Sequence, residues 1–154
     1  MSSRKELLAR IADESQRHYA AWTLFNQAMA DHLGLHPTDL QCLGLLGMEP
    51  EPLSTGRIAT LTGLTAGSAT RLVDRLEKAG LVVRTADPGD RRRALVALAP
   101  EALPRFAEAW DEPGEAFTEL LDGYSDRDLD VIADFLGRAT EVGRTQAARL
   151  SAGR

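Results

Sequence analysis

Residues 64–98 read LTAGSATRLVDRLEKAGLVVRTADPGDRRRALVAL, and this stretch decides the fold. Thr65 can cap a helix, because threonine often accepts a backbone N–H at a helix start. Gly80 ends that helix. The spacing of three and four residues places one apolar stripe on its inner face: Ala69, Leu72, Val73, Leu76 and Ala79. The opposite face then presents short hydroxyls and long cations, chiefly Ser68, Thr70, Arg71, Arg75 and Lys78.

Two short apolar runs follow this helix, at 81–85 and 93–99. They are β-branched enough for strands, and Asp87, Pro88 and Gly89 supply the turn between them. A helix followed by a basic hairpin predicts a winged helix-turn-helix.

The segments LTAGSATRLVDRLEKAGLVVR and DPGDRRRALVAL resemble the recognition helix and the wing of the MarR family of bacterial transcription regulators. The resemblance extends more weakly over the whole chain. It implies one MarR-type domain, 1–154, of mainly α (α+β) class. We expect a winged head with a two-stranded wing at 38–99, and dimerisation helices at 1–36 and 101–154. Two features depart from the family pattern: Ala99 stands where a capping threonine is common, and Pro113-Gly114 interrupts the fifth helix.

Apolar spacing outside the head predicts further helices. The first should be long, with its stripe at Ile11, Ser15, His18, Trp22, Phe25, Met29 and Leu33. A second helix should open at Pro37 or Thr38, and Ser54 should cap a third from Thr55 to Leu61. Thr62 and Gly63 would form the turn of the helix-turn-helix.

Pro100 restarts helix after the wing, and Ser125 should cap the last helix. Proline inside a helix removes a hydrogen bond, so we expect a kink or break at Pro113-Gly114. The end helices carry more apolar surface than one small head can cover, which favours an obligate homodimer.

Composition agrees with a small regulator. One cysteine excludes an intrachain disulfide, and neither a signal peptide nor a membrane-spanning run is evident, which indicates a cytoplasmic protein that requires no cofactor. The net charge is −5, but residues 57–93 carry eight Lys/Arg against four Asp/Glu. That segment therefore has a charge of +4 and the remainder −9. A basic head on an acidic body can still attract DNA, because salt screens charges beyond about 8–10 Å.

These residues predict contacts with double-stranded DNA at a pseudo-palindromic operator. A dimer would place two recognition helices about one helical turn, ~10 bp, apart. Arg71 is the main candidate for base contact, because guanidinium can bind guanine in a bidentate fashion. The other candidates on the two helices are Thr55 and Arg57 for phosphates, and Thr65, Ser68, Thr70 and Arg75. By resemblance, Arg92 would enter the minor groove, Asp90 would orient it by a salt bridge, and Arg91 and Arg93 would contact the backbone.

The resemblance also implies a small aromatic or phenolic effector, held between the dimerisation helices and the head and able to release a repressor from DNA. Candidate ligand residues combine apolar area with a polar tip: His18, Trp22, His36 and Trp110. Each could instead be ordinary core.

Other interpretations stay open at this point. The head could be a protein-docking module. Cys42 could sense oxidants, although no nearby cation in sequence lowers its pKa, and His32 with His36 could bind a metal, although Gly34 lies between them. An enzyme is disfavoured, because neither a phosphate loop nor a nucleophile with a nearby histidine is present.

Overall fold

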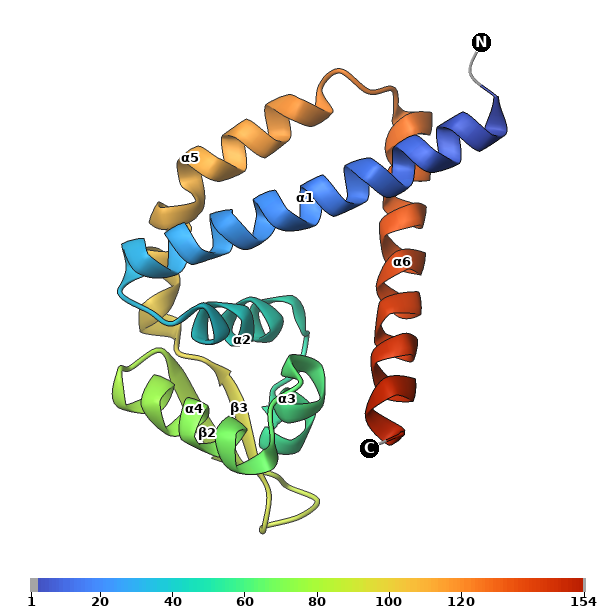
Figure 1. Ribbon diagram of the computed structural model, residues 1–154. Helices are drawn as coiled ribbons and strands as arrows, with labels where there is room; N and C mark the ends of the chain where they lie inside the picture. The colour runs from blue at the N-terminus through green and yellow to red at the C-terminus, as the bar shows by residue number, and fades with distance from the viewer. Residues whose placement is uncertain (1–2, 154) are drawn as a thin grey trace. The chain divides into compact units, whose positions relative to one another are not determined.

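The computed structural model describes residues 3–153, and the ribbon is drawn in Figure 1. The helices are α1 (Arg4–Leu33), α2 (Pro37–Met48), α3 (Thr55–Thr62), α4 (Ala66–Lys78), α5 (Leu103–Leu121) and α6 (Asp126–Ala152). The strands are β1 (Leu53–Ser54), β2 (Val82–Ala86) and β3 (Ala94–Leu98), and a short 3₁₀ turn, η1, spans Pro100–Ala102. The mainly helical winged-helix fold predicted from the sequence is confirmed.

Contacts within the chain divide it into two units, of which the first ends at Ala109 and the second begins at Trp110. The first contains α1 to α4, the sheet and the start of α5. The second contains the rest of α5 and α6. The predicted division into a head and dimerisation helices stays a prediction. Met1, Ser2 and Arg154, which that prediction includes, lie outside the described residues.

Side-chain caps fix where the helices of the head begin. Ser54 Oγ accepts the backbone N–H of Arg57 at 3.1 Å at the start of α3, and Thr65 Oγ1 accepts that of Ser68 at 3.2 Å at the start of α4. Each cap satisfies a donor that the helix itself cannot pair. Ser125 caps α6 in the same way, so all three predicted caps are confirmed.

The start of α2 uses a histidine as its cap. His36 Nδ1 accepts the N–H of Thr38 at 3.2 Å, and the carboxylate of Asp39 accepts the N–H of His36 at 3.3 Å. Pro37 therefore occupies the first helical position, where its missing N–H costs nothing. His36 therefore has a structural role as the N-cap of α2, which the sequence did not predict.

The turn between α3 and α4 depends on glycine. Gly63 has φ 72°, and so does Gly80 after α4. This left-handed region is strained for residues with a Cβ, so glycine ends both helices where the chain must reverse.

A small antiparallel sheet completes the head. Its order is β1-β3-β2, with Val82 opposite Leu98 and Ala86 opposite Ala94 in the hairpin. The predicted two-stranded wing is present as β2 and β3. The third strand was not predicted: Leu53 and Ser54 pair with Val96 and Leu95. This pairing attaches the start of α3 to the wing.

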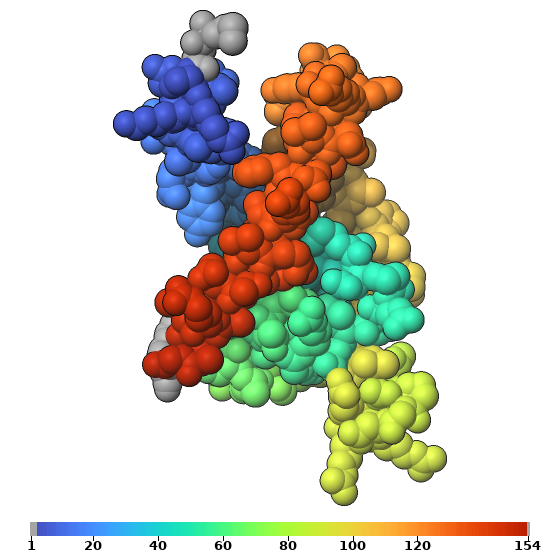
Figure 2. Space-filling model, turned by 90° about the vertical axis from the view of Figure 1, so that its right-hand side faces the viewer, coloured from blue at the N-terminus to red at the C-terminus, as the bar shows by residue number. Residues whose placement is uncertain are grey.

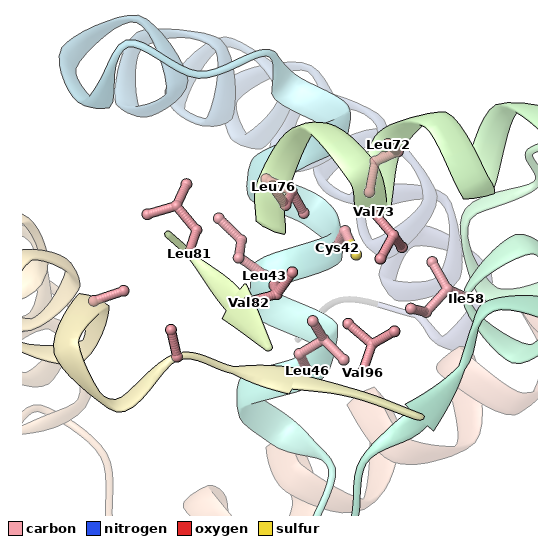
Figure 3. Close-up of a cluster of buried hydrophobic side chains, with 12 residues drawn as sticks. Cys42, Leu43, Leu46, Ile58, Leu72, Val73, Leu76, Leu81, Val82 and Val96 are labelled. Carbon is pink, nitrogen blue, oxygen red and sulfur yellow. The ribbon is translucent and has the colours of Figure 1, made fainter. Parts of the chain in front are cut away.

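The core of the head lies between α2, α3, α4 and the sheet, as Figure 3 shows. The predicted inner face of α4 is buried at Ala69, Leu72, Val73 and Leu76, each at most 2% exposed. Ala79, the last residue of the predicted stripe, is exposed, because α4 ends at Lys78. Of the buried residues, Leu72, Val73 and Leu76 pack with a cluster from the neighbouring elements: Cys42, Leu43, Leu46, Ile58, Leu81, Val82 and Val96. Packing in this core therefore fixes the position and the rotation of α4 relative to the sheet.

The helices at the two ends of the chain are much less covered. In α1 only Met29, Ala30 and Leu33 are buried among the described residues, and in α5 and α6 none is. Pro113 lies inside α5, which continues through it, so a break there is wrong.

Candidate nucleic-acid interface

The outer face of α4 presents a small polar cluster at its N-terminal end. Thr65 Oγ1 donates to Ser68 Oγ at 3.0 Å, and Arg71 Nη2 donates to the same oxygen at 3.2 Å. Thr70 lies on the same exposed turn and donates its hydroxyl to the carbonyl of Ala66 at 3.0 Å. The structure thus brings Thr65, Ser68 and Arg71 together, as the predicted interface requires, and leaves the Arg71 side chain on the surface.

Arg75 makes a different contact. Its Nε donates to Asp39 Oδ2 at 3.2 Å, and its Nη2 forms a shorter bond with Asp39 Oδ1. The Asp39 side chain is 4% exposed and that of Arg75 is 55% exposed. Two of the donors of Arg75 are therefore engaged by α2, and its predicted contact with DNA stays a prediction. The hydrogen bonds to Asp39 also raise the pKa of Arg75, so this group stays charged.

Arg84 is a residue that the sequence analysis missed. From β2 it donates to Asp74 Oδ1 at 2.6 Å and to Glu77 Oε2 at 2.5 Å, both on α4. Arg84 therefore ties the wing to the recognition helix and compensates two carboxylates on the face of α4 (side chains 58% and 44% exposed). The available signal was the spacing of two acids three apart on one helix, followed by an arginine in the next strand.

The wing tip is organised by two aspartates. Asp87 Oδ1 accepts the N–H of Gly89 at 2.8 Å, and Asp90 Oδ1 accepts the N–H of Arg92 at 3.0 Å. The resemblance implied a side-chain salt bridge from Asp90 to Arg92, but among residues 3–153 the Asp90 carboxylate accepts a hydrogen bond from the backbone N–H of Arg92. Asp90 therefore shapes the loop and leaves the guanidinium unpaired. Arg91, Arg92 and Arg93 are all exposed.

The loop that carries these arginines projects from the head, and it is the yellow-green lobe in Figure 2. Thr55 and Arg57, predicted for phosphate contact, lie in the first turn of α3. A pocket of about 630 Å³ lies between that turn and the base of the wing, so these two predicted groups of residues share one surface depression.

The candidate ligand residues are only partly brought together. His18 and Trp22 are neighbours on α1, with ring centroids 6.0 Å apart, and Trp22 is 5.5 Å from Phe25. His36 caps α2, and Trp110 opens the second unit. Trp22 is 38% exposed, so it is not a fully buried core residue in the single chain.

Oxidant sensing by Cys42 and metal binding by histidines depend on what surrounds these side chains. Burial, and secondarily the charge of Asp39, raises the pKa of Cys42 from 9.0 to about 11. The thiolate that an oxidant would attack is therefore scarce at neutral pH. Among residues 3–153, no three His, Cys, Asp or Glu side chains gather in a group that could hold a metal ion. No helix within residues 3–153 combines the length and the apolar character needed to span a membrane.

A helix-turn-helix joined to an arginine-rich hairpin on one small sheet defines a winged-helix protein of the DNA-binding type. Residues 33–93 match the MarR family model. The chain is 36% identical over 149 residues to the uncharacterized HTH-type transcriptional regulator YcgE of Bacillus subtilis, an alignment that covers 97% of this chain and 96% of YcgE. This chain belongs to the MarR family, and it is a transcription regulator rather than an enzyme.

Two other likenesses agree with that assignment. A MarR family transcriptional regulator from Silicibacter pomeroyi has a TM-score of 0.70 at 26% identity, covering 92% of this chain and 95% of that one. The crystal structure of NadR in complex with 4-hydroxyphenylacetate has a TM-score of 0.68 at 22% identity, covering 84% and 91%. The second likeness concerns the fold alone.

Proposed function

We propose that this chain is a homodimeric repressor that binds an inverted-repeat operator through α4 and the wing, and that a small aromatic ligand releases it. The observation that carries the DNA-binding half is the exposed set of cations on one head. Arg71 lies in the second turn of α4, and Arg91, Arg92 and Arg93 lie on the loop that projects from the same head. Major-groove insertion of the helix and minor-groove contact by the loop fit this arrangement.

The dimer is supported by uncovered apolar side chains on both end helices. On α6, Val131, Phe135, Leu136 and Val142 are each at least 51% exposed in the single chain. On α1, Leu8 and Ile11 are 53% and 48% exposed. Apolar surface of this extent on a monomer marks an interaction site, and a two-fold interface between copies covers it with the same helices.

The ligand is supported by the cluster on α1. His18, Trp22 and Phe25 form a tilted aromatic row that combines apolar area with a ring nitrogen. NadR, which resembles this chain in fold, has been crystallised with 4-hydroxyphenylacetate, a phenolic acid. We propose that an aromatic acid binds beside His18 and Trp22 on α1. Such a ligand releases the repressor from DNA only if it binds more tightly to a dimer conformation that does not fit the operator than to one that does. We place this activity in the cytoplasm, with the DNA.

The experiment that tests DNA binding uses fluorescence anisotropy with the DNA upstream of the chain's own coding sequence. Arg71→Ala should weaken binding by about 5- to 150-fold, since a bidentate base contact contributes about 1–3 kcal/mol. Arg92→Ala should weaken it by a comparable factor, most strongly on A·T-rich flanks. Arg127→Ala, in the first turn of α6, removes the same charge and should change affinity less than twofold.

If neither head substitution weakens binding beyond the Arg127→Ala control at the same salt, the assignment of these residues to DNA is wrong, and a protein-docking head takes its place. The ligand is tested by thermal shift with a panel of aromatic acids. A compound that raises the melting temperature and also lowers operator affinity supports the proposal, and a panel in which none does both argues for a regulator without such an effector.

A further inference from the structure

The pocket between α3 and the wing has a lining unlike that of a pocket for an aromatic compound. Its walls include Ser54, Thr55, Arg57 and Thr60 from the α3 side and Arg92 and Arg93 from the wing. Its volume of about 630 Å³ falls within the range of about 300–1,000 Å³ that is usual for small-ligand sites. Such sites are mostly apolar, whereas six of the eight residues that line this pocket carry a hydroxyl or a guanidinium, the exceptions being Gly56 and Ala94. The pocket therefore favours a compact, highly charged anion.

The charge of the pocket is positive and largely uncompensated. Three arginines line it, and among the described residues none of its lining side chains is acidic. In residues 3–153 the guanidiniums of Arg57 and Arg92 form no ion pair. Arg93 Nε lies 3.9 Å from Asp87 Oδ2, which is the outer limit of a salt bridge, so most of its donors stay available.

Neutral donors point to the same occupant. Ser54 Oγ accepts the N–H of Arg57, which leaves its own proton for an oxygen in the pocket. Pairing of β1 with β3 holds Ser54 opposite Leu95, next to the strand that follows Arg93. Ser54 and the wing arginines therefore line the same pocket from different parts of the chain. A tetrahedral oxyanion accepts bonds from several directions at once, and arginine binds phosphate with paired donors.

We propose that this α3–wing pocket is a phosphate-binding site. In the complex with DNA it takes a phosphate of the backbone, and in the free protein it takes inorganic phosphate or pyrophosphate, which excludes DNA from the same place. The DNA half of this inference rests on the function proposed above. The anion half stands on the pocket alone. Binding of a free anion would give a second way to release the protein from DNA, one that needs no aromatic ligand.

The direct test is calorimetric titration of the full-length protein with sodium pyrophosphate at constant ionic strength. Pyrophosphate should bind, and Arg57→Gln and Arg93→Gln should each lower its affinity at least fivefold. Arg93→Lys should recover part of the loss, because the charge remains. Arg71→Gln lies on α4 outside the pocket lining and should leave pyrophosphate affinity within twofold, as should Arg127→Gln. Circular dichroism melting confirms that the variants are folded.

The second arm measures binding to the upstream DNA across a range of chloride concentrations, with and without pyrophosphate. Each lost phosphate contact reduces the slope of log affinity against log salt by about one, so Arg93→Gln and Arg57→Gln should flatten it. Pyrophosphate should displace DNA from the wild type more than chloride of equal ionic strength does.

The outcomes separate the two sources of phosphate. Pyrophosphate binding that competes with DNA shows that the site takes both. A flattened slope without pyrophosphate binding shows that the DNA backbone is the only occupant and overturns the anion half. If the wild type binds DNA and neither pocket substitution changes pyrophosphate affinity or the salt slope, the phosphate site is wrong. If the wild type does not bind DNA at all, the proposed function fails instead, and the pyrophosphate titration still decides the pocket.

Discussion

Asp39 and Arg75 form a two-bond ion pair that ties α2 to the recognition helix. The carboxylate is almost fully buried, and the same carboxylate accepts the N–H of His36 at the start of α2. The Asp39 side chain thus takes part in the cap of α2 and also holds α4 through Arg75. Because a buried charge is costly without its partner, this pair restricts the position of α4 relative to the core.

Replacing Asp39 with Asn should destabilise the protein by about 1–3 kcal/mol. The charged pair is lost, and one amide group must replace a carboxylate that accepts bonds from both Arg75 and His36. We expect a lower midpoint in urea denaturation with an unchanged slope. Affinity for DNA should fall as well, because α4 is less firmly held.

A double-mutant cycle with Arg75→Met provides the control. If the pair is the cause, Asp39→Asn should cost less in the Arg75→Met background than in the wild type. Equal costs in both backgrounds would show that the two side chains act independently and would remove the positioning function.

Replacing Arg84 with Met should weaken DNA binding more than it weakens the fold. The substitution leaves the carboxylates of Asp74 and Glu77 uncompensated on the face of α4. Their repulsion of DNA phosphates should lower affinity by about threefold or more at low salt, and less at high salt because salt screens it. Anisotropy at two salt concentrations measures this difference.

Adding Asp74→Asn and Glu77→Gln to Arg84→Met tests the cause. Affinity should recover toward that of the wild type if the acids are responsible. A variant that stays weak would indicate that Arg84 acts by holding the wing in place.

Cys42 should make stability depend on pH in the alkaline range. Its pKa is raised from 9.0 to about 11 by burial and by Asp39, so the folded state favours the neutral thiol. The corresponding stability is fully present below pH 9 and is lost as pH rises through 11. The difference is on the order of 2–3 kcal/mol. Urea denaturation of the wild type and of Cys42→Ala between pH 8 and 11 should show the steeper loss in the wild type. Parallel curves would contradict it.

Replacing Leu136 with Glu should dissociate the proposed dimer. Leu136 is 55% exposed in the single chain, so a charge there costs a monomer little but would be desolvated in an interface. Sedimentation velocity should show a shift from dimer to monomer at micromolar concentration. Gln146→Glu, on the same helix, serves as the charge control. A wild type that sediments as a monomer would overturn the dimer itself.

The sequence alone determined the local features of this protein. Ser54, Thr65 and Ser125 act as caps, and the spacing from Ala69 to Leu76 places the buried face of α4 correctly. These features depend on residues three or four positions apart, where helix geometry fixes which side chains meet. The continuity of α5 through Pro113 was not predictable in this way, because a local cost can be offset by contacts elsewhere.

Only the tertiary structure decided the contacts between elements distant in sequence. Asp39 and Arg75 are 36 positions apart, and β1 pairs with β3 across the whole helix-turn-helix. Arg84 reaches α4, and the α3–wing pocket forms, because packing of the apolar core sets how α4, α3 and the sheet are placed against each other. Sequence periodicity tells which face of an element is apolar, but it does not give the distance between polar faces of two elements. That distance is a property of the packed core.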